Sequence, residues 1–239
     1  MTAAPSTEVV ILCGGQGTRF RAVDPVGPKA LAMVAGRPFL DILLDQFIHA
    51  GYERFILCVG YGADAIEEYI KDAKYNALIK FSREQSPRGT GGAVKAAAHM
   101  ITGQHFFVAN GDSYCDADLA GLFHFHMSQP DAHATMALTR SDERIDAGNV
   151  TLVGSTGKIL LFVEKEKSIT SHWKNAGIYV FNKKLFAEIP ADQQISLEYE
   201  IFPKLVGRGL YGYTTPHPVI DIGTPERYNK AQEYFNNKI

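Results

Sequence analysis

Residues 8–31 read EVVILCGGQGTRFRAVDPVGPKAL, and this stretch decides the fold. It opens with EVVILC, a short apolar run typical of a strand buried on both faces of a parallel sheet. Three glycines and Arg19 follow directly, so backbone N–H groups and a cation can approach an anion at the end of this strand. Because ligands of open α/β sheets bind at the carboxyl ends of the strands, the stretch predicts a phosphate-binding loop.

The loop matches neither of the two commonest phosphate-binding motifs. A Rossmann fingerprint would place a third glycine where Phe20 stands, and a P-loop would end in G-K-[ST], which is missing. Both motifs run straight into a helix, whereas here a segment with several prolines separates the loop from the next helical pattern at 38–51. A long loop in this place favours a functional flap that reaches Lys29, with a plain glycine-rich turn and surface cations as the alternative.

Strand and helix patterns alternate through the first part of the chain. Strands are predicted at 8–13, 54–60, 78–84, 105–112 and 133–140, and helices at 38–51, 63–73, 90–101 and 118–129. Strands that alternate with helices of about ten residues need right-handed crossovers and form a mostly parallel sheet. The predicted fold class is therefore α/β, with helices flanking a central sheet.

After about residue 140 the pattern becomes that of a small antiparallel addition. The predicted elements are a hairpin over 149–165 turning at Ser155-Thr156-Gly157, a strand at 175–182, short helices, a closing strand in 212–223 and a helix at 225–237. This last helix has the pattern of an ordinary amphipathic surface helix, with Thr224 as its N-cap and Pro225 at its first position. No Pro-, Gly- or Ser-rich linker interrupts the chain, so residues 1–239 are predicted to form a single domain.

Composition and charge exclude several classes of protein. A formal net charge of −2 lacks the basic surplus of proteins that track nucleic acid. Three cysteines without a CxxC spacing indicate neither a disulfide framework nor a zinc site. Because there is no long apolar segment and no signal-peptide pattern, we expect a cytoplasmic protein without membrane contact.

The segments GGQGTRF and PKAL together resemble the G-G-x-G-T-R and P-K-x-L signature of sugar-phosphate nucleotidyltransferases. Further segments similar to this family follow in its order: EQSPRGTGGAV, NGD, VEK, NAGIYVF and DIGTPERY. The resemblance implies a Rossmann-like nucleotidyltransferase fold, with a nucleotide-binding half over 8–140 and a sugar-phosphate-binding half over 141–239. It also implies the reaction of a nucleoside triphosphate with a sugar 1-phosphate to give a nucleoside diphosphate sugar and pyrophosphate.

That reaction needs no covalent enzyme intermediate, so its catalysis depends on positioning and on neutralisation of phosphate charge. Arg19, Lys29 and Asp112 are the candidate catalytic residues, because two cations can hold a triphosphate and a carboxylate can hold a metal. Lys29 could alternatively be a solvated loop charge. The candidate nucleotide-binding residues are Leu12, Gly14, Gly15, Gly17, Thr18, Glu84, Gly89 and Thr90.

Two aspartates are predicted to hold Mg²⁺. Asp112 ends the predicted strand 105–112, and Asp221 ends VID in the closing strand. Two carboxylates held together repel one another unless a cation lies between them, and oxygen ligands suit magnesium. Each aspartate alone could instead be a helix cap or a turn residue.

The base and the sugar are expected to be read by separate residues. Guanine offers two neighbouring donors, N1–H and the 2-amino group, which the single carboxylate of Glu84 can accept, so GTP is favoured. Relatives that use uracil or thymine more often carry glutamine at the matching place. The resemblance places Gly111, Glu164, Lys165, Asn175 and Gly177 at the sugar phosphate, with Glu166 where the family often has proline.

Glu84, GTGG and SLEYEIFPKL look most similar to guanylyltransferases that act on D-glycero-α-D-manno-heptose 1-phosphate. Such enzymes make GDP-heptose for bacterial capsule, lipopolysaccharide or surface-layer glycans. A mannose or glucose 1-phosphate nucleotidyltransferase using GTP, UTP or dTTP is the alternative within the family. A nucleotide-sensing subunit without catalysis is the alternative of another class. Dimers or tetramers are common among relatives, so a homo-oligomer is one option.

Overall fold

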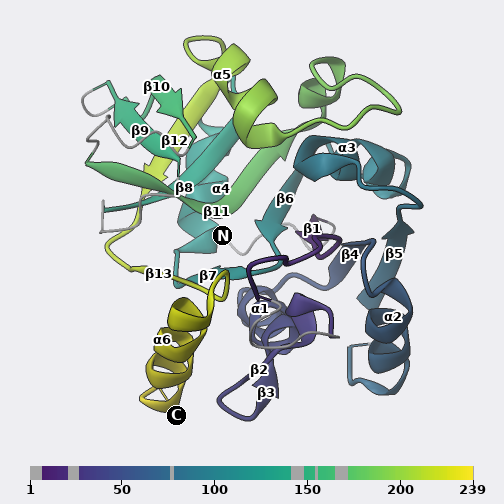
Figure 1. Ribbon diagram of the computed structural model, residues 1–239. Coiled ribbons are helices and arrows are strands. Elements are labelled where there is room, and N and C mark those ends of the chain that lie inside the picture. Colours follow the sequence, from purple (N-terminus) through teal and green to yellow (C-terminus); the bar gives the residue numbers. More distant parts are fainter. Residues whose placement is uncertain are drawn as a thin grey trace.

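The strand before the glycine loop, β1 (Glu8–Leu12), lies in the middle of the main sheet (Figure 1). It pairs in parallel with β4 (Arg54–Val59) on one side and with β6 (His105–Asn110) on the other. β5 (Ile79–Arg83) continues the sheet in parallel on β4. The prediction of a mostly parallel sheet around the first strand is confirmed.

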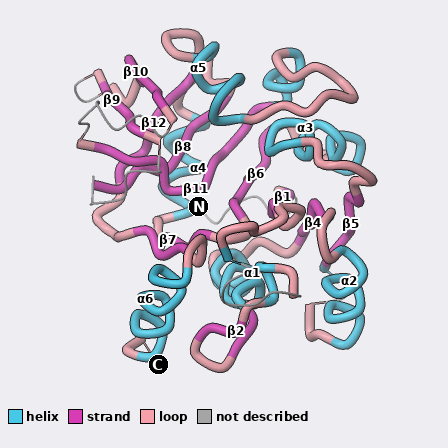
Figure 2. The backbone as a smooth tube through the Cα atoms, in the orientation of Figure 1, coloured by secondary structure: helices cyan, strands magenta, loops and turns pink. Residues whose placement is uncertain are grey.

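The computed structural model describes residues 7–20, 27–75, 78–140, 148–153, 156–164 and 172–238. The helices and short turns of the first half are η2 (Lys29–Leu31), α1 (Phe39–His49), α2 (Ala63–Asp72), α3 (Gly89–Ala96), η4 (Ala97–Met100) and α4 (Leu119–Met127). Figure 2 shows these helices around the strands, as the alternating pattern predicts. Within the described residues no helix is long and apolar enough to span a bilayer.

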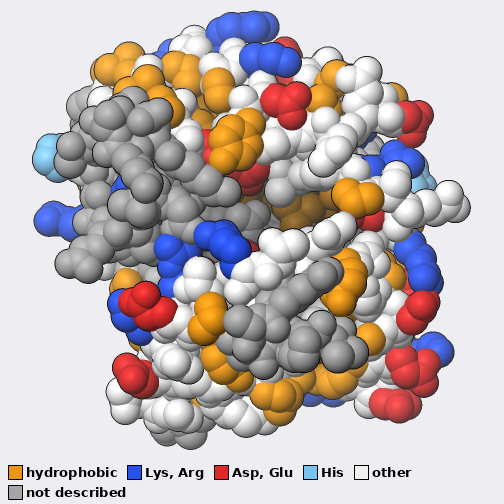
Figure 3. Space-filling model, in the orientation of Figure 1, with side chains coloured by type: hydrophobic (Ala, Val, Ile, Leu, Met, Phe, Trp, Pro, Cys, Tyr) orange, Lys and Arg blue, Asp and Glu red, His pale blue; other side chains and the backbone are white. Residues whose placement is uncertain are grey.

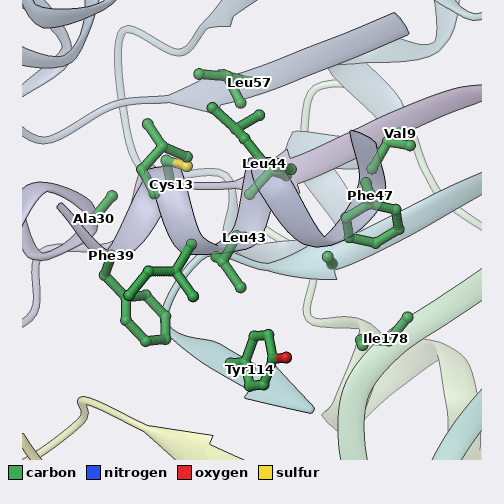
Figure 4. Packing of buried hydrophobic residues seen from close by; sticks show 14 of the residues in the cluster. Val9, Cys13, Ala30, Phe39, Leu43, Leu44, Phe47, Leu57, Tyr114 and Ile178 are labelled. Atoms are coloured by element: carbon green, nitrogen blue, oxygen red, sulfur yellow. The ribbon is translucent and has the colours of Figure 1, made fainter. Parts of the chain in front are cut away.

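Alternating side chains of β1 build two separate cores. Val9 and Ile11 belong to the cluster that packs on α1, shown in Figure 4, whereas Val10 belongs to the cluster that includes Val94 of α3. All three β1 side chains are fully buried. Because successive side chains of a strand point to opposite faces, a strand with helices on both sides must be apolar throughout.

Antiparallel strands extend the same sheet into the second half of the chain. The long strand β11 (Trp173–Asn182) pairs antiparallel with β6 and with β8 (Ala134–Arg140), and β12 (Leu210–Thr214) pairs parallel with β8. The predicted hairpin is confirmed as β9 (Asn149–Leu152) and β10 (Ile159–Val163), although Ser155 of its predicted turn lies outside the described residues. Shorter elements are β2 (Met33–Val34), β3 (Arg37–Pro38), β7 (Ser113–Cys115), η5 (Lys183–Ala187), the π-helical turn η6 (Leu197–Ile201) and α5 (Phe202–Leu205).

The prediction of one closing strand in 212–223 is wrong, because this segment forms two strands in different sheets. β12 ends at Thr214, and β13 (Val219–Asp221) pairs antiparallel with β7 instead. Pro216 and Pro218 lie between the two strands, and proline has no N–H with which to continue a ladder. The chain therefore leaves the main sheet after β12 and continues to β13, which pairs with β7.

The last helix, α6 (Pro225–Asn236), begins as predicted. The Thr224 side chain accepts a hydrogen bond from the Arg227 N–H at 3.4 Å, and Pro225 occupies the first helical position. Farther along α6, the Gln232 side chain donates to the carbonyl of Met33 in β2.

A buried carboxylate fixes the start of β1. Glu8 is 3 % exposed, and its side chain accepts hydrogen bonds from the N–H groups of Thr102 and Gly103, each at 3.1 Å. Arg54 forms an ion pair with it at 3.5 Å. Burial works to raise the pKa of Glu8, but the hydrogen bonds outweigh it and the pKa lies below its usual value.

Glu8→Gln is expected to lower the free energy of unfolding at pH 7 by about 1–3 kcal/mol, because it weakens charge-assisted hydrogen bonds inside the protein. Since the folded-state pKa of Glu8 is depressed, its contribution is complete above the unfolded value near 4.5 and is lost as the pH falls through the folded pKa. Urea unfolding of the variant and the wild type at pH 7 and below pH 4.5 measures the difference, which should shrink in acid. The exposed Glu226→Gln is the control, and an equal loss in both variants would contradict the prediction.

Candidate active site

Two cavities meet at the carboxyl ends of the central strands, where the molecule is hollowed in Figure 3. The first has a volume of about 820 Å³ and is lined by the glycine loop and by the loop after β5. The second has a volume of about 260 Å³ and lies between β11, β13 and the start of α6. Thr90, Asn110 and Asp112 line both cavities, so the two spaces share one wall.

The glycine loop lies along the first cavity. Leu12, Gly14, Gly15 and Gly17 line it, and Gly17 has φ +56°, a conformation that favours glycine. The side chain that replaces the third Rossmann glycine, Phe20, is 2 % exposed and packs edge-on against Tyr228 of α6 at 5.5 Å. Phe20, which stands in place of the glycine, therefore packs the loop against the last helix. Thr18 is exposed and lines neither cavity.

The two loop cations lie on opposite sides of the shared wall. Lys29, in the turn after Pro28, lines the first cavity and forms an ion pair with Asp112. Arg19 lines the second cavity instead of the first. Burial works to raise the pKa of Asp112, but Lys29, the Ser113 hydroxyl and Arg19 together hold it below its usual value. The carboxylate is thus kept charged. Residues 21–26, between the two cations, lie outside the described residues.

Strand pairing brings the two predicted metal ligands to one place. β6 ends at Asn110, two residues before the predicted strand end, so Asp112 lies in the turn before β7. Asp221 pairs with Ser113 across β7 and β13, and the N–H of Ile222 donates to the carbonyl of Asp112 at 3.1 Å. Both aspartates line the second cavity.

The two carboxylates fit a magnesium ion that takes its other ligands from outside the protein. The described residues contain no cluster of three or more His, Cys, Asp and Glu side chains that could hold a metal. Mg²⁺ commonly takes one or two carboxylates and completes its shell with water and phosphate oxygens. The alternative interpretation of Asp221 as a turn residue also has support, because its Oδ1 accepts the Gly223 N–H at 2.9 Å. Asp221 Oδ1 thus accepts a hydrogen bond within the turn, while the same side chain lines the second cavity.

Glu84 lies across the ends of β1 and β4. Its Oε2 accepts the Arg88 N–H at 3.2 Å. Its Oε1 lies only 2.7 Å and 2.6 Å from where a Cβ would stand on Gly14 and Gly60, so both glycines make room for this carboxylate. Burial raises the pKa of Glu84, and the Arg88 N–H and charge partly oppose the rise. A ligand in the first cavity therefore meets a sheltered hydrogen-bond acceptor.

The start of α3 connects the two cavities. Gly89 has φ +69°, and a Cβ there would come within 2.5 Å of the Ile195 carbonyl oxygen. The Thr90 hydroxyl donates to Glu198 Oε2 at 2.7 Å and accepts the Leu197 N–H at 2.8 Å. Thr90, predicted from sequence beside the nucleotide, thereby also holds the π-helical turn η6, a type of distortion frequent at functional sites.

A β-bulge in β11 shapes the floor of the second cavity. The register of β11 shifts between Asn175 and Tyr179, and Gly177 between them has φ +76°. Asn175 accepts the Gly177 N–H at 3.0 Å and donates to the Tyr179 hydroxyl at 2.7 Å. Bulges are frequent next to active sites, where they redirect side chains.

Of the predicted sugar-phosphate residues, Glu164, Asn175 and Gly177 line the second cavity, and Gly111 lines the first. Lys165 lies outside the described residues. Sequence reasoning missed several lining residues: Asn110, Gly148, Glu198, Tyr199 and Arg227. Arg227 was predicted to lie on an ordinary surface helix; the DIGTPERY segment, which contains it, resembles the family but gave this arginine no role. Only the crossing of the chain to β13 places it here.

The chain belongs to the nucleotidyl transferase family, whose model matches residues 8–238. It is 33% identical over 234 residues to the D-glycero-alpha-D-manno-heptose 1-phosphate guanylyltransferase of Aneurinibacillus thermoaerophilus, covering 97% of this chain and 100% of that relative. It is 34% identical over 230 residues to the mannose-1-phosphate guanylyltransferase of Mycobacterium tuberculosis, covering 95% of this chain but only 64% of that longer relative.

A solved structure has the same fold over nearly the whole chain. HddC from Yersinia pseudotuberculosis, crystallised with GMP-PN, superposes with a TM-score of 0.81 at 34% identity. The match covers 96% of this chain and 99% of that chain. The predicted Rossmann-like nucleotidyltransferase fold is thereby confirmed.

Gly177→Ala is expected to destabilise the protein more than Gly207→Ala. Both glycines have φ above +70°, so each alanine carries the left-handed strain of about 1–2 kcal/mol. A Cβ at Gly207 meets nothing within 4 Å, whereas one at Gly177 lies 3.0 Å from Asn110 Nδ2, which must move. Urea unfolding should show a larger loss for Gly177→Ala, and equal losses would show that the bulge can yield without cost.

Proposed function

We propose that the protein is a sugar-1-phosphate guanylyltransferase, which transfers GMP from GTP to a sugar 1-phosphate and releases pyrophosphate. The observation that carries the proposal is the meeting of the two cavities at Asp112. The larger one, beside the glycine loop, has a volume typical of small-molecule sites, about 300–1,000 Å³. A nucleotide in the first cavity and a sugar phosphate in the second would have their phosphates at the shared wall.

The reaction is an in-line displacement at the α-phosphorus of GTP. A phosphate oxygen of the sugar 1-phosphate forms the new P–O bond while the bond to the pyrophosphate oxygen breaks, and the pyrophosphate leaves with the electron pair. Lys29 and Arg19 flank the shared wall from opposite sides, where their charges would neutralise the polyanion. Asp112 and Asp221 would hold Mg²⁺, which supplies further charge neutralisation at the α-phosphate when it is bound.

GTP is favoured by the position of Glu84. Its carboxylate lines the first cavity beside Gly89 and can accept both donors of the guanine edge. The guanylyltransferase relatives and the GMP-PN complex of HddC support the same base.

For the sugar we favour D-glycero-α-D-manno-heptose 1-phosphate, since that relative is matched over 100% of its length. Mannose 1-phosphate is the second candidate, because the mannose-1-phosphate guanylyltransferase is 34% identical. The GDP-sugar would serve a bacterial surface polysaccharide, and the protein would act in the cytoplasm.

The proposal is tested by pyrophosphate release with GTP, UTP, dTTP and ATP, each against heptose, mannose and glucose 1-phosphates. Release with GTP and a manno-configured sugar is expected, and it should stop when EDTA removes Mg²⁺. Asp112→Asn is expected to abolish release while GTP still binds in calorimetry. GTP binding without release from any sugar would reject the enzyme and leave a nucleotide-sensing protein.

Glu84→Gln is expected to lower kcat/KM for GTP about 10–100-fold relative to UTP, because glutamine can accept only one guanine donor and presents an N–H₂ to the other. The range corresponds to the loss of a bidentate base contact worth about 1–3 kcal/mol. Glu68→Gln, an exposed glutamate of α2, is the control and should leave the ratio unchanged. An unaltered GTP to UTP ratio in Glu84→Gln would remove Glu84 from base recognition.

A further inference from the structure

Arg227 faces the second cavity although it belongs to the first turn of the C-terminal helix. Its side chain is 23% exposed, and Nη1 lies 3.4 Å from Asp221 Oδ1. The other α6 cation, Lys230, is 69% exposed and forms an ion pair with Glu226 on the helix surface. The two cations of one helix are thus placed differently, one in the cavity wall and one in solvent.

Two guanidinium groups converge beside Asp221. A Cβ built on Gly223 would lie 3.8 Å from Arg227 Nη1 and 3.9 Å from Arg19 Nη2, so both groups border the same small space. Glycine leaves this space open. Two guanidinium groups that border one space can together bind a ligand that carries more than one negative charge.

The charges of the second cavity are distributed unevenly. Glu164 lies just after the end of β10 and Glu198 lies in η6. In Figure 1, β10 and α5, the helix that directly follows η6, lie at the top of the molecule, and α6 lies at the bottom. Carboxylates accept hydrogen bonds from sugar hydroxyls and repel phosphate. A sugar phosphate would thus turn its ring toward the glutamates and its phosphate toward the arginines. Figure 3 shows Lys and Arg side chains gathered at the edge of the central hollow, above α6.

We propose that Arg227 binds the phosphate of the sugar 1-phosphate and holds it beside Asp221 for attack. This inference rests on the proposed function. The planar guanidinium offers paired N–H donors that match two phosphate oxygens, which a lysine cannot do. The N-terminal end of α6 adds partial positive charge at the same point.

Two other roles of Arg227 lead to different measurements. If the arginine only holds Asp221 through their ion pair, its removal would change the Mg²⁺ dependence of the reaction. If it binds the leaving pyrophosphate or the GTP phosphates, its removal would weaken GTP instead. Binding to the sugar phosphate alone changes the KM of the sugar 1-phosphate and leaves GTP and Mg²⁺ dependence intact.

The test uses the full chain with Arg227→Gln, Arg227→Lys and the control Lys230→Gln, which removes an α6 charge outside the cavity. Each is assayed with the sugar 1-phosphate that gives the fastest pyrophosphate release in the wild type. Arg227→Gln should raise the KM of that sugar phosphate at least tenfold, with the KM of GTP and half-saturating Mg²⁺ within twofold. Arg227→Lys should recover part of the loss, and Lys230→Gln should behave as wild type.

A second readout does not depend on turnover. Calorimetry without Mg²⁺, in the presence of GMP, should show at least tenfold weaker binding of the same sugar 1-phosphate to Arg227→Gln. An unchanged KM and binding constant, or a change confined to GTP or to Mg²⁺, would overturn the proposal. If no sugar phosphate supports pyrophosphate release by the wild type, it is the proposed function that is rejected. Sugar-phosphate binding at the wild-type level in both Arg227 variants would reject the role of Arg227 and leave the proposed function intact.

Discussion

The short antiparallel pairing of β7 with β13 is the contact on which the arrangement of the candidate site depends. It places Asp221 opposite Ser113 and directs the Ile222 N–H to the carbonyl of Asp112. Backbone hydrogen bonds are directional, so this pairing defines which carboxylates share a wall of the cavity. Gly223, Thr224 and the start of α6 follow β13 in the chain and therefore lie near that wall. This short pairing thereby joins residues that are 104 to 108 positions apart in the chain.

Each carboxylate at the centre of the site already has a cationic neighbour. Lys29 pairs with Asp112, and Arg227 pairs with Asp221. Lys29 contributes to holding the pKa of Asp112 below its usual value, and each of the two cations borders one of the cavities. The side chains that balance charge within the protein are thus the ones that we propose to contact the substrates. Binding a polyanion and a metal would exchange these ion pairs for new ones.

Local patterns in the sequence predicted the elements well where one segment carried its own signal. Apolar runs of five or six residues indicated the buried parallel strands, and Thr224-Pro225 indicated the start of α6. The structural role of Phe20 could not be predicted from the sequence. The sequence shows only that it is not glycine, whereas the fold shows it packed against Tyr228 as an anchor of the loop. The single closing strand was predicted wrongly because two prolines interrupt an otherwise continuous β pattern.

By itself the sequence determined the order of most strands and helices, the family signature in the glycine loop and the residue types available at each strand end. These properties depend on neighbouring residues, whose periodicity and turn preferences act over short distances. Only the tertiary structure decided that Arg19 lies in the second cavity, that Thr90 holds Glu198, and that Arg227 leaves the surface for the cavity wall. Such placements follow from pairing between distant segments, which depends on the geometry of the whole sheet and leaves no periodic trace in the chain.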